Sequence, residues 1–383
     1  MRSAQLSVRI AVLKFLNNML KKKVLMTGNE AIAEGAVQAG CRFYAGYPIT
    51  PQNELPAYMA ERMPEVGGIF IQAESELAAI NMVFGAVAAG ARAMTSSSSP
   101  GISLKQEGIS YIAGAELPAV IVNVMRGGPG LGNIWPAQSD YFQATRSGGH
   151  GDYHSIVLAP ASVQEAYDIM PLAFNLADKY RTPAMILADG MLGQMMEPVQ
   201  VMSYELRVMS KSQKLTTHNS QLTTKPWALT GCKGRKPNII KSFYMKEGDL
   251  ERFNLILQKK YKTIQQREQR WQDLFLDDAR IILVAYGTMA RIAKAAVNKL
   301  REKGKRVGLI RPITLWPFPH DIFKRLAGKE RQIKFLVIEM SYGQMLEDVK
   351  LALNCKFPVE FLGRSGGGIP SEGEIMHRLR KVT

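Results

Sequence analysis

A proline-rich segment after an apolar run is the first candidate for chemistry. Tyr47-Pro48-Ile49-Thr50-Pro51 follows Phe43–Gly46, a predicted strand. The prolines restrict the backbone, so the hydroxyl of Thr50 is presented from a defined position, as a binding loop requires. The same residues also suit an ordinary helix start, with Thr50 as the N-cap and Pro51 at the first helical position. The sequence alone leaves both interpretations open.

A carboxylate ahead of a charge-free helix is the second candidate. Glu76 precedes Leu77–Ala86, which predicts a buried helix. At the entrance of such a helix a carboxyl group would be partly desolvated and able to make a strong hydrogen bond to a ring nitrogen. The alternative for both Glu74 and Glu76 is structural, because the helix dipole stabilises acids in a first turn.

Two more polar segments follow predicted strands. Thr95–Gly101 is rich in serine, and its small residues permit close backbone approach to a ligand, although a plain loop has the same composition. Arg126 ends an apolar run and precedes glycines, where it could clamp a carboxylate or form a surface salt bridge. The segment Val124–Gly132 lacks the GxGxxG pattern of dinucleotide sites.

Patterns for metals, nucleophiles and clusters are weak. His150 and His154 lie among glycines, which disfavour the helix that an i,i+4 metal pair needs, so 149–155 is predicted to be a shaped loop near the site. Asp189-Gly190 follows an alanine where a diphosphate–magnesium motif has glycine, and a diphosphate site on this chain is not expected. The three cysteines, Cys41, Cys232 and Cys355, have no cluster or disulfide spacing, which favours a reducing cytoplasmic setting.

Alternating apolar runs and helical patterns predict the elements that position these residues. In the first part the strands are expected at Phe43–Gly46, Gly68–Ile71, Arg92–Thr95, Ala119–Val124, Ser155–Leu158 and Ala184–Leu187, with helices such as Asn29–Ala39, Ser75–Ala89 and Ser162–Asp178 between them. In the second they are expected at Ile281–Ala285, Val307–Arg311, Phe335–Glu339 and Val359–Leu362, with helices at 289–303, 319–327 and 343–353. Such alternation predicts doubly wound parallel sheets, whose ligands lie beyond the carboxyl ends of the strands. Residues 248–275 between the two parts are predicted to form one long charged helix.

The charge distribution and hydropathy exclude some functions. The net charge of +16 is concentrated in the first twenty-three residues and in 205–246. Neither run is interleaved with aromatic residues as in single-strand binders, so nucleic acid is not predicted; an acidic protein or an anionic small molecule suits the charge equally well. No window approaches the roughly 18 uninterrupted apolar residues of a membrane span, so no membrane association is predicted.

Six segments in order resemble the alpha subunit of 2-oxoacid:ferredoxin oxidoreductases, relatives of pyruvate:ferredoxin oxidoreductase. They are Tyr47–Pro51, Glu74–Ala79, Gly149–Tyr153, Pro226–Gly231, Arg311–Pro319 and Gly343–Val349. The last three, with Gly363–Gly367, look most like the branched-chain (2-oxoisovalerate) group. The resemblance runs from about Lys23 to the C-terminus. The family often has a glycine soon after Thr-Ser, where this chain has Ser97, Ser98 and Ser99.

The resemblance implies a thiamine diphosphate-binding-type doubly wound parallel sheet followed by a smaller transketolase C-terminal-like α/β domain. Glu76 would be the catalytic acid that hydrogen-bonds N1′ of the aminopyrimidine, and Tyr47, Pro48 and Ile49 would line the cofactor. Thr50 and Arg126 would bind the substrate carboxylate. The expected divisions are 1–22 as an extension outside the fold, 23–200 as the pyrimidine-binding domain, 201–276 as a basic linker with the connecting helix, and 277–383 as the second domain.

The resemblance also implies partners. A beta subunit would hold the diphosphate and magnesium, and ferredoxin-like and gamma subunits would complete the complex, with the iron–sulfur clusters on other chains. The expected reaction is oxidative decarboxylation of a 2-oxoacid, with 3-methyl-2-oxobutanoate as the first choice, to an acyl-coenzyme A, while ferredoxin is reduced. The alternatives are a 2-oxoglutarate- or pyruvate-specific member of the family, or a non-catalytic scaffold subunit.

Overall fold

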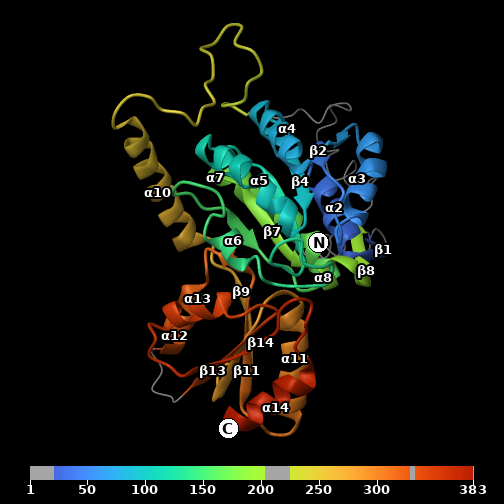
Figure 1. Cartoon of the computed structure of the whole chain (residues 1–383), viewed down its shortest axis with the longest axis vertical. Coiled ribbons are helices and arrows are strands. Elements are labelled where there is room, and N and C mark those ends of the chain that lie inside the picture. Colours follow the sequence, from blue (N-terminus) through green and yellow to red (C-terminus); the bar gives the residue numbers. More distant parts are fainter. Residues whose placement is uncertain (1–20, 203–224, 328–332, 383) are drawn as a thin grey trace, which may run out of the picture.

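A seven-stranded sheet carries most of the candidate residues (Figure 1). The computed structural model describes residues 21–202, 225–327 and 333–382; the extension at 1–20 and residues 203–224 of the basic segment lie outside them. The strands of this sheet, in spatial order, are β12 (Thr314–Trp316), β6 (Ile156–Leu158), β7 (Ala184–Asp189), β5 (Val120–Met125), β4 (Ala93–Ser97), β2 (Phe43–Gly46) and β3 (Ile69–Gln72). Neighbouring strands run parallel except β12, which is antiparallel to β6.

Helices flank this sheet, as strand–helix alternation requires. They are α2 (Gly28–Gln38), α3 (Glu54–Glu65), α4 (Glu76–Ala88), α5 (Ser99–Gly114), α6 (Tyr141–Thr145), α7 (Val163–Tyr180) and α8 (Gly190–Gln194). An antiparallel pair, β1 (Lys21–Thr27) and β8 (Met196–Met202), lies beside α2 and α7. In the part of the chain that the structure describes, none of the helices is long and apolar enough to cross a membrane.

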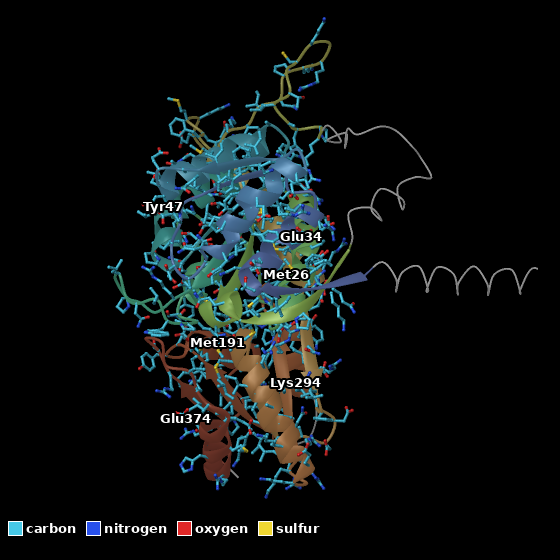
Figure 2. The ribbon with its side chains drawn as sticks, turned by 90° about the vertical axis from the view of Figure 1, so that its right-hand side faces the viewer. Met26, Glu34, Tyr47, Met191, Lys294 and Glu374 are labelled. Carbon is cyan, nitrogen blue, oxygen red and sulfur yellow. The ribbon has the colours of Figure 1, made fainter. Side chains whose placement is uncertain are left out.

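A second α/β unit lies beyond one end of the first (Figure 1). Its sheet has the order β14 (Val359–Gly363), β13 (Lys334–Glu339), β10 (Ile281–Val284), β11 (Val307–Pro312) and β9 (Trp271–Leu274). Its helices are α11 (Gly287–Glu302), α12 (His320–Ala327), α13 (Gln344–Ala352) and α14 (Glu372–Val382). In Figure 2, Lys294 and Glu374 mark this unit, and Met191 lies close to its junction with the first.

The predicted strands are all present, each within two residues of its expected bounds. The predicted helix over 248–275 is wrong at its C-terminal end. The helix, α10 (Asp249–Arg267), stops because Glu268 is buried and binds Lys179, Tyr180 and Arg270. Residues 271–274 instead form β9, antiparallel to β11.

Polar contacts at the junction join the two units. The guanidinium of Arg311 donates to both carboxylate oxygens of Glu165 at 2.8 Å. The side chain of Gln138 accepts from the backbone N–H of Met340 and donates to the carbonyl of Tyr286. Together with β12, which belongs to the second part of the chain but pairs with β6, these contacts fix the second unit against the first sheet.

The Arg311–Glu165 pair gives a test of the junction. Arg311→Met leaves the Glu165 carboxylate without its bidentate partner in a largely buried place, so we expect the free energy of unfolding to fall by about 3 kcal/mol. Urea unfolding followed by circular dichroism measures this. Arg311→Lys keeps the charge but loses the paired geometry, and should cost less. If the free energy of unfolding fell by less than about 0.5 kcal/mol in the methionine variant, as for an ordinary surface substitution, the Arg311–Glu165 pair would not stabilise the junction.

Candidate active site

Four loops meet at the carboxyl edge of the first sheet. β5, β4, β2 and β3 are consecutive neighbours and run parallel, so the segments that follow them emerge side by side. These segments carry Arg126, Ser98–Gly101, Tyr47–Pro51 and Glu76, in that order across the sheet. The chain leaves β2 on one side to form β3 and returns on the other to form β4. This is a switch point of the topology, where doubly wound sheets bind ligands.

The loop after β2 is held by amide side chains. Asn29, buried on α2, donates its amide to the carbonyl of Pro51 at 2.8 Å. Gln52 is also buried; it donates its amide to the carbonyl of Tyr47 at 3.3 Å and accepts from the hydroxyl of Ser96 at 2.5 Å. The loop is therefore fixed from its inner side, while Tyr47 is 38% exposed and lies at the edge of the unit in Figure 2.

The alternative of a helix start at Thr50 is wrong. The helix after this loop is α3, which begins at Glu54 with Asn53 as the N-cap. Thr50 and Pro51 precede that cap, and the half-buried Thr50 hydroxyl accepts a hydrogen bond from the Asn53 amide at 3.2 Å. The sequence pattern was ambiguous because a threonine before a proline suits both a stiff loop and a helix terminus.

Glu76 is the first residue of α4. Ser75 caps the helix by accepting from the N–H of Ala78 at 3.1 Å, and the Glu76 residue is only 6% exposed. The predicted burial of Leu77–Ala86 holds for one face only: α4 buries Ala79, Ile80 and Val83 but leaves Leu77 46% exposed. The acid is thus buried at the start of a helix whose outer face is exposed at Leu77 and Asn81.

The side chain of Glu76 lies against the first turn of α5. A Cβ at Gly101 would come within 2.5 Å of Glu76 Oε1 and 2.0 Å of Ser97 Oγ, so only glycine suits this position. Three hydroxyl groups in the adjoining segment, those of Thr95, Ser97 and Ser98, are buried without a hydrogen-bond partner among the described residues. Buried polar atoms normally have partners. A ring with nitrogen donors and acceptors, such as an aminopyrimidine, has groups that could satisfy them beside a carboxyl group, so the residues present fit the pyrimidine half of thiamine diphosphate.

Arg126 joins two of the loops. Its Nη1 donates to the carbonyl of Thr50 at 2.9 Å and its Nη2 to the carbonyl of Leu131 at 3.1 Å, while Nε is buried without a partner in the described part of the chain. The Ser99 hydroxyl fixes its backbone by accepting from the Arg126 N–H at 3.0 Å. The structure thus brings Arg126 and Thr50 together.

Two features of this site are absent from the sequence prediction. Asp140 accepts from Ser99 at 2.5 Å and from Asn123 at 2.9 Å; burial raises the pKa of its carboxyl, while these two hydrogen bonds oppose the rise. The Gly363–Gly367 motif packs on the loop after β5, because Asn133 donates to the carbonyl of Gly366 at 3.0 Å. Asp140 gave no signal, since it lies in an irregular stretch between elements.

Asp189 is part of the junction. It caps α8 through the N–H of Leu192 and accepts from the hydroxyl of Thr288 at 2.7 Å and from its N–H at 3.0 Å. Burial raises the pKa of this carboxyl, and the same hydrogen bonds oppose the rise. Among the described residues, no group of three His, Cys, Asp or Glu side chains could hold a metal ion.

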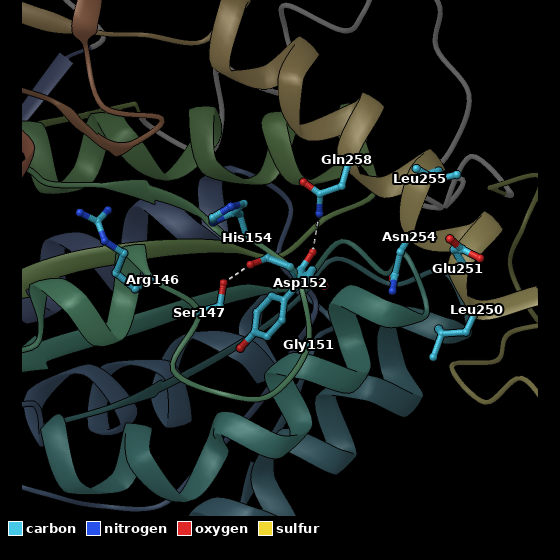
Figure 3. A pocket seen from close by; sticks show the side chains of 11 residues that line it. Arg146, Ser147, Gly151, Asp152, His154, Leu250, Glu251, Asn254, Leu255 and Gln258 are labelled. Atoms are coloured by element: carbon cyan, nitrogen blue, oxygen red, sulfur yellow. Dashed lines mark hydrogen bonds between the residues drawn. The ribbon is translucent and has the colours of Figure 1, made fainter. Parts of the chain in front are cut away.

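The 149–155 loop packs between α5 and α10. His154 stacks on Trp316 with ring centroids 4.4 Å apart, and burial lowers the pKa of its imidazole to about 4. The carbonyl of His150 accepts from Ser110 on α5 at 2.6 Å. With α10 the loop lines an open cavity of about 580 Å³, where Gln258 donates to the carbonyl of Asp152 at 2.8 Å (Figure 3).

Both units of the chain match known protein families. Residues 34–249 match the family model described as pyruvate flavodoxin/ferredoxin oxidoreductase, thiamine diP-binding, and residues 279–375 match pyruvate:ferredoxin oxidoreductase core domain II. The solved structure of a 2-oxoglutarate:ferredoxin oxidoreductase from Magnetococcus marinus, with 2-oxoglutarate, coenzyme A and succinyl-CoA bound, superposes with a TM-score of 0.81 at 26% identity. The match covers 94% of this chain and 65% of that one.

Two curated relatives match along nearly their whole length. The ketoisovalerate oxidoreductase subunit VorB of Methanothermobacter marburgensis is 49% identical over 358 residues, which cover 94% of this chain and 97% of that protein. The 2-oxoglutarate synthase subunit KorA of Methanocaldococcus jannaschii is 36% identical over 369 residues, covering 92% and 98%.

The doubly wound sheet with its polar carboxyl edge, followed by a smaller α/β unit, defines a fold of the thiamine diphosphate-binding type, as predicted. The chain belongs to the 2-oxoacid:ferredoxin oxidoreductase family and is a subunit of such an enzyme.

Gly101 tests the packing of the site. Gly101→Ala forces a methyl group against Ser97 and Glu76, so we expect the free energy of unfolding to fall by about 1–3 kcal/mol. Gly85→Ala is the matched control in the neighbouring helix: nothing lies within 4 Å of its added Cβ, and alanine should raise stability by up to about 1 kcal/mol. Urea unfolding of both variants measures the difference. Equal effects with the same sign would contradict the described packing.

Proposed function

We propose that this subunit supplies the pyrimidine-side half of a thiamine diphosphate site shared with a partner chain. The complex decarboxylates a branched-chain 2-oxoacid, 3-methyl-2-oxobutanoate, forms the acyl-coenzyme A and reduces ferredoxin. The observation that carries the site is the buried carboxyl group of Glu76 beside Gly101 and three unpartnered hydroxyls. The substrate choice rests on the ketoisovalerate oxidoreductase relative, which is more similar than the 2-oxoglutarate synthase relative (49% against 36%).

Glu76 acts at the aminopyrimidine. Bound thiamine diphosphate would supply a nucleophilic carbon for the oxo group and a sink for the electron pair of the bond that breaks. The carboxyl group of Glu76 shares a proton with N1′ of the ring, and its burial strengthens this hydrogen bond. Tyr47, Pro48 and Ile49 form the wall on which the ring rests, held rigid through Asn29 and Gln52.

Arg126 and Thr50 bind the substrate carboxylate. Two N–H groups of the Arg126 guanidinium are used by carbonyls, which orients the group and leaves the second hydrogens of both Nη atoms for an anion. The Thr50 hydroxyl, held by Asn53, lies on the same loop as one of those carbonyls. Holding the carboxylate fixes the orientation of the bond that breaks.

The diphosphate, magnesium and clusters belong to partner chains. The outer faces of α4 and α5 and the loop after β5 expose large apolar side chains beside the site: Leu77, Leu104, Tyr111, Leu131, Ile134 and Trp135. Large exposed apolar side chains on neighbouring elements are candidates for an interaction site. We assign this surface, the α4–α5 face, to the partner that holds the diphosphate, because both helices begin at the site. Ferredoxin-like and gamma subunits complete the complex.

Glu76 gives the direct test of the proposal. In the assembled complex, Glu76→Gln should lower the rate of 2-oxoacid-dependent ferredoxin reduction about 10²–10⁴-fold, because an amide cannot take the proton. Glu74→Gln, two residues earlier and exposed, is the control and should keep the wild-type rate. Assays with 3-methyl-2-oxobutanoate, 2-oxoglutarate and pyruvate rank the substrates. A Glu76→Gln complex with the wild-type rate would contradict the role of Glu76 at the cofactor. A preference for 2-oxoglutarate or pyruvate would contradict 3-methyl-2-oxobutanoate as the substrate.

A charged substitution on the α4–α5 face tests whether the partner binds there. Leu104→Glu places a carboxylate on the α4–α5 face, where Leu104 is 57% exposed, and should weaken partner binding more than about tenfold, since desolvating an unpaired charge costs over 1.4 kcal/mol. Leu351→Glu on α13, 60% exposed, is the matched control. Association is measured by light scattering or interferometry. Wild-type affinity for the Leu104 variant would place the partner elsewhere.

A further inference from the structure

Lys105 is fully buried beside the candidate acid. It lies on α5, four residues after Gly101, and its residue is 0% exposed. Its ammonium nitrogen donates to the main-chain carbonyl of Glu76 at 3.2 Å. Lysines are almost never fully buried without a carboxylate partner, and this one lies near the N-terminal end of α4, where the helix dipole disfavours a cation. The arrangement therefore lowers stability, and folding alone does not account for it.

The charged groups around Lys105 are few. From α4 the charge of Glu76 acts on it. On α5 itself, Glu107 is exposed and accepts from Tyr111 at 2.5 Å. From the segment before α6, Asp140 is held by Ser99 and Asn123, and His150 of the 149–155 loop packs edge-on against Tyr111. Among the described residues, Glu76 is the carboxylate whose charge contributes to the pKa of Lys105.

We propose that Lys105 is a positioning residue for Glu76. Its ammonium group holds the backbone of the first residue of α4 and places a positive charge beside the carboxyl group that contacts the aminopyrimidine. This inference rests on the proposed function of Glu76. When Lys105 is protonated, it stabilises the ionised carboxylate and fixes the helix start. When it is neutral, the electrostatic support is lost and the hydrogen bond weakens.

The protonation of Lys105 changes within the range of an enzyme assay. Burial lowers the pKa of its ammonium group from 10.5 to about 8, and Glu76 opposes the shift. Cofactor affinity and activity should therefore fall as the pH rises through about 8. Stability should change in the opposite direction. Because the unfolded chain keeps the proton up to its ordinary pKa, it binds more protons between pH 8 and 10.5, and this group's contribution to stability rises with pH there.

The test uses the assembled complex with Lys105→Met and Lys105→Arg. Thiamine diphosphate affinity is measured by titration and kcat/KM is followed from pH 6.5 to 9.5. The wild type should show an alkaline decline near pH 8. The methionine variant should bind the cofactor about tenfold more weakly at pH 7, a change of 1.4 kcal/mol, and lack that decline. The arginine variant, charged throughout, should bind within about threefold of wild type and also lack it.

Lys260→Met is the control. Lys260 lies on α10 and pairs with Glu116, which follows α5, and burial lowers the pKa of its ammonium group too. This variant should keep the wild-type affinity for thiamine diphosphate and the wild-type pH dependence of kcat/KM. An alkaline decline that persists in both Lys105 variants, or its absence from the wild type, overturns the inference. If the methionine variant does not fold, the arginine variant and the wild-type profile still decide it. Failure of Glu76→Gln to affect activity would instead overturn the proposed function, so the two failures are distinguishable.

Discussion

The close approach of α5 to the Glu76 side chain is the contact on which the site depends. It requires glycine at 101, since any Cβ there would overlap Ser97 and the carboxylate. It also requires α4 and α5 to start at neighbouring points of one sheet edge, which the parallel strands β2, β3 and β4 provide. Because both helices are held at this distance, a buried acid, a buried lysine and unpartnered hydroxyls are gathered in one small volume. Burying such polar groups without partners costs free energy, part of which a polar aromatic ring could recover by hydrogen bonding.

The second unit contacts the loop that follows β5 at the carboxyl edge of the first sheet. Its part of the chain also contributes β12 to the first sheet. The hydroxyl of Thr288 donates to Asp189, and Gly366 packs on the loop that follows Arg126. The guanidinium of Arg126 is therefore fixed by the carbonyls of Thr50 and Leu131, and the loop that contains Leu131 contacts the second unit. The second unit has no residue in the proposed chemistry, but it sets the shape of the wall against which the substrate carboxylate would rest.

The sequence predicted the strands because the central parallel strands are continuous apolar runs, and these need no tertiary information. It missed β1, β8, β9 and β12, which pair only once segments distant in sequence are in place. It extended α10 because Trp271 and Leu274 keep a helical spacing. Lys105 was missed for a related reason: a lysine in a helix normally marks the solvated face, and its burial follows from how α4 and α5 pack. The choice between loop and helix cap at Thr50 likewise needed the position of Asn53.

If this chain forms half of a cofactor site, it needs its partner to bind thiamine diphosphate tightly. Titration of thiamine diphosphate with magnesium into the subunit alone, the partner alone and the assembled complex, followed by calorimetry, tests it most directly. We expect tight binding by the complex, binding at least about a hundredfold weaker by either chain alone, and loss of the difference when Glu76 is replaced by alanine. Binding to this subunit alone with the affinity of the complex would contradict it.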